Sequence, residues 1–371
     1  MVTALIFIIV LGVLIFVHEL GHFLAARASG IRVDAFKLGF GPKICAWKRG
    51  ETEYGLNLIP FGGYVKIFGE NPNDESINGA NKARSFVHKS WWRQVSVLVA
   101  GVCFNFVFAW LLYTIVFTSG VTATVGGFER YVNDFKNQRV MVTYVGVGSP
   151  AEKAGIAIGD VIVATVAPSM TQLPGGIPVT VTSIQDTVNS SKGDSVDVTV
   201  QRKDGAHTIQ VRPIQGLVEG KYAVGIGMDT VGDLHLPVYV AVWEGLHYTY
   251  NMIGQTIQGL GTFFMTIFKG TANFSDISGP VGIAGIVGNA AQMGFTYLLM
   301  ITALISINLG VINLLPFPAL DGGRTLFVLL ETLFRRKIPT TFVNVVNLAG
   351  FALLMILMIV VTFKDIVKLI K

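Results

Sequence analysis

The chain of 371 residues is unusually apolar, since hydrophobic residues make up 51% of it, charged residues only 14%, and the mean hydropathy is +0.58. Soluble proteins normally carry about a quarter charged residues, so the composition excludes an ordinary soluble enzyme. The formal net charge of +5 comes from loops, and the sequence shows no basic helix with interleaved aromatic residues. We therefore expect no nucleic-acid partner.

Four apolar runs each approach the ~20 residues that are needed to cross about 30 Å of hydrocarbon. They cover residues 2–26, 95–118, 297–315 and 342–363. The first run has no basic stretch before it, so we interpret it as a retained span and not as a signal peptide. The sequence therefore predicts an α-helical polytopic membrane protein with four transmembrane helices in a lipid bilayer.

Basic residues near the runs predict the orientation of the spans. Eleven Lys and Arg residues lie in the loop 27–93, and four follow the third run: Arg324, Arg335, Arg336 and Lys337. Both loops are therefore predicted to be cytoplasmic. Both termini and the long segment 119–294 are then extracytoplasmic, although three lysines in the last eight residues oppose an outside tail.

The first run contains His18-Glu19-Leu20-Gly21-His22, the zinc-hydrolase pattern H-E-x-x-H. On a helix, His18 and His22 lie one turn apart on the same face and can both offer a ring nitrogen to one Zn²⁺. Glu19 can then take a proton from a metal-bound water. One ionisable residue near the middle of a bilayer costs on the order of 3 kcal/mol, so three within five positions indicate function.

A second charged residue, Asp321, follows the third run in the stretch Asn313-Leu-Leu-Pro-Phe-Pro-Ala-Leu-Asp321-Gly-Gly. The prolines break the helix and the glycines allow close approach, so the carboxylate can turn back toward the membrane. Two histidines leave a catalytic zinc one protein ligand short, and we predict Asp321 as the third. Asn313 can hydrogen-bond a developing oxyanion or the substrate backbone, or it can simply join helices.

These two motifs, together with Gly101-Val-Cys-Phe-Asn105 in the second run, resemble those of the site-2 proteases, which are intramembrane zinc metalloproteases. Their order and spacing are similar to the bacterial branch typified by the regulator of sigma-E protease, over essentially the whole chain. The resemblance implies a multi-pass protein of the bacterial cytoplasmic (inner) membrane that cleaves single-pass transmembrane proteins. Anti-sigma factors are the implied substrates, with remnant signal peptides as a second class, and Asn105 is an implied substrate contact.

Between the first two runs, residues 32–68 alternate around glycines as strands do. This region resembles the family's membrane-reentrant β-sheet on the cytoplasmic side, with a G-x-G loop at Gly39-Phe40-Gly41. A peptide bond within a helix is shielded, so the protease must extend its substrate before water can attack. We expect an exposed edge at 54–60, with Tyr54, Leu56 and Leu58, to pair with it. A purely structural hairpin is the alternative.

From residue 139 to 213 the sequence changes to short β-branched runs, at 140–147, 160–166, 179–181, 196–201 and 208–211. The stretch Gly148-Ser-Pro-Ala, followed by Gly159-Asp160, resembles circularly permuted PDZ domains, which bind extended peptides or C-termini. A domain that only covers the active-site entrance is the alternative. There is room for one copy, whereas proteobacterial members of the family carry two, so a two-domain size filter is in doubt.

The predicted organisation is a membrane core at 1–118, an extracytoplasmic PDZ-like domain at 119–215, an interfacial amphipathic helical segment at 216–293 and a second membrane core at 294–371. One Zn²⁺ per chain is expected on His18, His22 and Asp321, with Glu19 as the catalytic base. Two other hypotheses are a catalytically idle scaffold and a metal transporter. The intact Glu19 argues against the first, and the lack of a repeat argues against the second.

Overall fold

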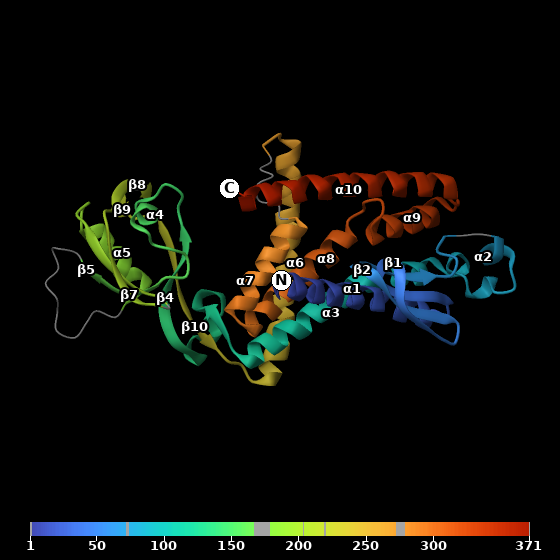
Figure 1. Cartoon of the computed structure of the whole chain (residues 1–371), viewed down its shortest axis with the longest axis horizontal. Coiled ribbons are helices and arrows are strands. Elements are labelled where there is room, and N and C mark those ends of the chain that lie inside the picture. Colours follow the sequence, from blue (N-terminus) through green and yellow to red (C-terminus); the bar gives the residue numbers. More distant parts are fainter. Residues whose placement is uncertain are drawn as a thin grey trace. The chain divides into compact units, whose positions relative to one another are not determined.

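The computed structural model describes residues 2–71, 74–166, 179–202, 204–218, 220–271 and 279–370. The chain forms two compact units, which are described separately. The first combines Met1–Val116 with Val238–Lys371, and the second is Phe117–Pro237. Figure 1 shows the long helices in the first unit and most of the strands in the second.

Four helices of the described chain are long and apolar enough to cross a membrane: α1 (Val2–Ala28), α3 (Trp91–Ser119), α8 (Phe295–Leu314) and α10 (Thr340–Ile370). The prediction of four apolar helices is confirmed. Other helices are α2 (Asp74–Asn78), α6 (Val238–Phe268), α7 (Pro280–Met293) and α9 (Asp321–Phe334), with 3₁₀ turns at Lys82–Arg84 and Phe86–His88. The predicted helical segment at 216–293 contains α6 and α7, and neither is among the four apolar helices.

The sheet of the first unit consists of β1 (Val33–Arg49) and β2 (Thr52–Ile67). Residues 35–38 of β1 lie between two parts of β2, because they are in register with both 53–56 and 63–66. Apolar residues of the sheet, Val33, Phe36, Val65 and Ile67, pack with Phe23 of α1 in one buried cluster. The sheet is therefore fixed beside α1, and 63–67 is one of its two edges, since no described strand pairs with the far side of that segment.

The second unit is built on a six-stranded sheet in the order β3-β10-β4-β5-β6-β7. Its strands are β3 (Val121–Thr124), β4 (Phe135–Val145), β5 (Val161–Val166), β6 (Val196–Arg202), β7 (Gly205–Val211) and β10 (Ile226–Leu234). A small hairpin of β8 (Ile214–Val218) and β9 (Lys221–Ala223), the helices α4 (Pro150–Ala154) and α5 (Val181–Ser190), and 3₁₀ turns at Val125–Gly127 and Glu129–Asp134 complete it. Buried valines and isoleucines from the sheet and α5 form its core.

Two segments differ from the predictions. The strand predicted at 179–181 is wrong, because Val181 begins α5. The Thr180 hydroxyl accepts the Ser183 backbone N–H at 3.1 Å, and the Ser183 hydroxyl accepts the Thr180 N–H at 2.9 Å. This capping box starts a helix despite the β-branched residues. Residues 216–234, which we joined to the helical segment, instead contain β9 and β10, because β10 pairs with β3 and β4 within the sheet.

Candidate metal centre and active-site cavity

The centre begins with two histidines one turn apart on α1. His18 and His22 are both buried, and their Nε2 atoms lie 3.2 Å apart. The spacing of four residues places both rings on one face of the helix, as predicted. The two nitrogens therefore point into one small volume.

Asp321 completes this group from the C-terminal segment of the first unit, Val238–Lys371. It is the first residue of α9, and its Oδ2 atom lies 3.1 Å from Nε2 of His18 and 3.2 Å from Nε2 of His22. A β-carbon at Gly322 would overlap the backbone oxygens of Leu314 and Leu315. Only glycine allows α9 to begin this close to the end of α8, so the Gly residues after Asp321 hold its carboxylate against the histidines.

The three atoms fit one tetrahedral metal ion. They form a triangle with sides of 3.1–3.2 Å, and ligands at about 2.0–2.1 Å from a tetrahedral zinc would lie roughly 3.3 Å apart. Asp321 Oδ2 is also buried and has no hydrogen-bond partner. Such an atom is costly unless something satisfies it, and a cation does so. Two imidazoles and one carboxylate are a donor set of zinc hydrolases.

Each histidine is held from behind by α3. His22 Nδ1 donates to the carbonyl of Val97 at 2.8 Å, which leaves Nε2 free as a ligand. His18 Nδ1 lies 3.1 Å from the side-chain amide of Asn105. For Nε2 of His18 to bind a metal, Nδ1 must carry the proton, so the amide oxygen has to face it. Asn105 has no exposed surface. The expectation that Asn105 contacts substrate therefore needs correction: it lies behind His18 and cannot reach a substrate.

Gly101 lets α3 cross α1 at the centre itself. A β-carbon there would overlap Nε2 of His22 and lie 2.8 Å from Cε1 of His18. The space above the two rings is therefore available only to glycine. The sequence pattern Gly101-x-x-x-Asn105 thus places a close approach and a histidine partner one turn apart on the same face of α3.

A cavity of about 730 Å³ opens at the centre and is lined by His18, Glu19, His22 and Asp321. Glu19 lies beside the sheet edge, next to the backbone N–H of Val65, and a β-carbon at Gly63 would lie 3.4 Å from the Glu19 Cγ atom. The outer edge of the sheet, residues 63–67, lines the cavity, and so does Phe40. Phe40 lies between Gly39 and Gly41, whose φ angles are +79° and +82°. The predicted G-x-G loop thus presents Phe40 to the cavity.

Of the eight predicted substrate contacts, only Phe40 is among the described residues that line this cavity, and seven are not: Gly39, Gly41, Tyr54, Leu56, Leu58, Asn105 and Asn313. Tyr54 packs edge-on against Phe23 of α1, with ring centroids 5.9 Å apart. Leu56 and Leu58 are 42% and 60% exposed, and Asn313 is half-buried near the end of α8. The expected edge at 54–60 is therefore displaced. The edge at the cavity is 63–67, because the later part of β2 folds back along β1.

Comparison with known proteins assigns the chain to a family, since the model of peptidase family M50 matches residues 6–357. The chain belongs to this family. A zinc metalloprotease candidate of Clostridium perfringens is 36% identical over 355 residues, which are 95% of each chain. Two proteins named zinc metalloprotease RasP are also similar. The one from Oceanobacillus iheyensis is 31% identical over all of both chains, and the one from Geobacillus kaustophilus is 28% identical over 98% of this chain and 97% of its own.

Membership in family M50 confirms the resemblance to site-2 proteases that the motifs indicate. Three contacts at the centre of this M50 chain escaped the sequence analysis: the carbonyl of Val97, the backbone N–H of Val65 and the ion pair of Arg324 with Glu70. The first two are backbone groups, which any residue supplies, so no sequence pattern marks them. The third joins two residues that are 254 positions apart, although a charged pair near two spans is a signal that could have been followed.

Proposed function

We propose that this chain is a zinc-dependent intramembrane endopeptidase, which cleaves the transmembrane segments of single-pass membrane proteins. The observation that carries the proposal is the convergence of His18, His22 and Asp321 on one point, beside Glu19, in a unit with helices long enough to span a membrane. The names of the RasP relatives support zinc as the metal. Anti-sigma factors and remnant signal peptides are the substrate classes that we propose.

The chemistry follows from the positions of these residues. Zinc held by His18, His22 and Asp321 would polarise the scissile carbonyl and make water more acidic. Glu19 takes the proton from the attacking water and later delivers it to the leaving amine. The Glu19 carboxylate lies beside the sheet edge, next to the Val65 N–H. His22 keeps its orientation through Val97, and no acyl-enzyme is needed.

Substrate presentation is proposed to use the sheet edge at 63–67. Backbone groups alternate in direction along a strand, and the Val65 N–H lies next to Glu19, so the backbone groups of Gly63 and the N–H of Ile67 face the same edge. The Ile67 carbonyl already accepts the Glu70 N–H at 3.2 Å. An unwound substrate segment that pairs there lies directly over the metal centre. Backbone pairing gives affinity without a strict sequence requirement, because it uses groups that every peptide has.

The second unit is proposed to be a PDZ-like domain outside the cytoplasm, as are both chain termini. Two local features support the domain type: Ser149 caps the short helix α4, and β5 follows Asp160. Such a domain binds an extended peptide or a C-terminus, or it limits access to the active site by size. The membrane core is proposed to lie in the cytoplasmic membrane of a bacterium, and the basic loops support the proposed orientation.

The experiment that tests the proposal uses purified protein in liposomes with a single-pass substrate. His22→Ala and Asp321→Ala are expected to lose both bound zinc and cleavage, because each removes one of three protein ligands. His247→Ala is the matched control, since that side chain is 63% exposed on α6. A chelator should abolish the cleavage by unmodified protein, and added zinc should restore it. Unchanged zinc in both ligand variants, or intact protein that binds zinc and cleaves no membrane substrate, would contradict the proposal.

A further inference from the structure

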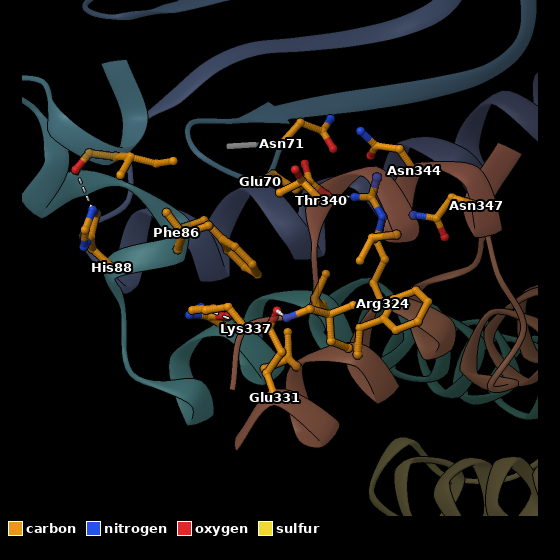
Figure 2. A pocket seen from close by; sticks show the side chains of 18 residues that line it. Glu70, Asn71, Phe86, His88, Arg324, Glu331, Lys337, Thr340, Asn344 and Asn347 are labelled. Atoms are coloured by element: carbon orange, nitrogen blue, oxygen red, sulfur yellow. Dashed lines mark hydrogen bonds and ion pairs between the residues drawn. The ribbon is translucent and has the colours of Figure 1, made fainter. Parts of the chain in front are cut away.

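A second cavity adjoins the one at the metal centre. It has a volume of about 500 Å³, within the range of ligand sites. It is lined by residues from the segment after β2, the 3₁₀ turn Phe86–His88, α3, α9 and α10. Four residues line both cavities: Glu70, Asn71, Leu98 and Arg324. The two spaces therefore meet at these side chains, which Figure 2 shows in part from within the second cavity.

An ion pair stands at this junction. Arg324, one turn after Asp321 on α9, pairs with Glu70, three residues after the end of β2. The Glu70 side chain is 17% exposed and that of Arg324 is 35% exposed. The pair joins the helix that carries the third proposed metal ligand to the strand that forms the sheet edge. It thus marks the place where a chain lying along that edge would leave the metal centre.

The sheet edge ends beside the second cavity, at a turn in which the Glu70 N–H donates to the Ile67 carbonyl at 3.2 Å. Residues 63–71 line the catalytic cavity in sequence, and Glu70 and Asn71 line both cavities. An extended peptide advances about 3.3 Å per residue, so a segment paired at 63–67 reaches the junction within roughly four to five residues. The second cavity therefore adjoins the end of the proposed path of the substrate. Its lining comes from the two loops predicted to be cytoplasmic and the helices next to them.

The lining suits a polypeptide with polar side chains. Amide groups of Asn71, Asn344 and Asn347 lie on the same side of the cavity as the Arg324–Glu70 pair (Figure 2). Amides offer donors and acceptors to an extended backbone, which has free groups of both kinds. One part of the wall is apolar and is formed by Phe86, Leu98 and Phe327. The charge of Lys337 is paired with Glu331 at 3.1 Å. Asn347 Oδ1 already accepts the Ala319 N–H at 3.2 Å, and a membrane lipid tail would offer no hydrogen bond to the amides of Asn71 and Asn344.

We propose that the second cavity binds the cytoplasmic flank of the substrate, as an extended polar peptide that continues from the sheet edge past the Arg324–Glu70 pair. This inference rests on the proposed function. It adds a site that holds the part of the substrate destined for the cytoplasm, several residues from the scissile bond. The cytoplasmic product then leaves the enzyme through the same cavity.

Disulfide crosslinking tests this path in Glu19→Gln protein, with Cys45→Ser and Cys103→Ala removing the native thiols. Asn344→Cys reports on the second cavity and Lys66→Cys on the sheet edge, because each lines only its own cavity. Val345→Cys is the matched control, since it is 60% exposed and is absent from the described lining. Single cysteines in the substrate are placed along its cytoplasmic flank.

We expect Lys66→Cys to crosslink to substrate positions next to the scissile bond, and Asn344→Cys to positions at least about four residues further into the flank. Val345→Cys should give at least tenfold less product. Crosslinks at Lys66→Cys with none at Asn344→Cys would overturn the inference and leave the proposed function standing. If neither variant crosslinks while unmodified protein cleaves, the inference also falls. Failure of unmodified protein to cleave identifies a failure of the proposed function.

A cavity-filling variant gives a second readout. Asn344→Trp should slow cleavage of a substrate with a long cytoplasmic flank about tenfold, and should leave a substrate truncated within about three residues of the scissile bond almost unaffected. Val345→Trp is expected to change neither rate. Equal effects of Asn344→Trp on both substrates would mean that the variant disturbs the fold, and equal full activity on both would mean that the cavity is not used. Either result overturns the inference.

Discussion

Substitution of Gly101 by alanine probes the metal centre without touching any proposed ligand. The new methyl group would overlap Nε2 of His22 and lie 2.8 Å from Cε1 of His18. Carbon atoms in ordinary contact are about 3.5–4.0 Å apart, so at least one ring has to move by roughly 0.7–1 Å. Metal–ligand distances tolerate about 0.2 Å. The displaced ring therefore ceases to be a good ligand.

The expected result for Gly101→Ala is a fall in zinc affinity of at least 10- to 100-fold and a fall in cleavage rate of about 100-fold. Helix propensity alone would make Gly101→Ala stabilising, because alanine is about 1 kcal/mol more favourable than glycine within a helix. The assay measures bound zinc after dialysis against a metal buffer and cleavage of a membrane substrate. Gly12→Ala is the control, because a β-carbon at Gly12 of α1 meets nothing within 4 Å. Full zinc binding and activity in Gly101→Ala would refute the geometry.

Three further predictions concern other parts of the chain. Asn105→Leu should lower zinc affinity about 10- to 100-fold, whereas Asn105→Asp should retain most of the affinity, because it keeps an acceptor for His18. Equal zinc titrations of the two variants would contradict the role of Asn105. Asp160→Asn should destabilise the second unit by about 1–3 kcal/mol, because Asp160 accepts two hydrogen bonds from Arg202. Proteolysis of the full chain measures this loss, and Asp186→Asn, at an exposed position, is the control that should show none. The Arg202 guanidinium holds the pKa of Asp160 below its ordinary value, so this stabilisation is present above about pH 4 and disappears as the pH falls through the lowered pKa; stability that is flat down to pH 2 would oppose it. A short linker can replace residues 122–233, because Val121 pairs with Leu234. This deletion should allow cleavage of substrates with an untrimmed outer portion. Loss of all cleavage in a stable deletion would mean that this unit supports the core.

The three side chains that converge at the candidate metal centre could be predicted because their signals are local or chemical. The spacing of His18 and His22 fixes their common face on a helix, whatever the rest of the fold does. Asp321 followed from the need for a third ligand and from the prolines and glycines around it. The four apolar helices were predictable for a similar reason, since length and composition alone define them.

The sheet edge at the cavity could not be predicted in the same way. Residues 35–38 pair with two separate parts of β2, and the alternation of the sequence is compatible with either part being outermost. Only the packing of Val65 and Ile67 with Phe23 of α1 decides that 63–67 faces the cavity. In the same way, the position of Asn105 behind His18 depends on how α3 crosses α1, which the sequence of neither helix states.

The most direct test of a zinc-dependent proton transfer is bound zinc and cleavage measured together on Glu19→Gln protein. Glu19 lines the cavity but is not one of the three atoms that converge on the metal position. The substitution removes the proton acceptor and keeps every ligand, so zinc content should stay at that of the unmodified protein while cleavage of a membrane substrate falls below detection. Full cleavage by Glu19→Gln protein, or loss of its zinc, would contradict the assignment of Glu19 as the base.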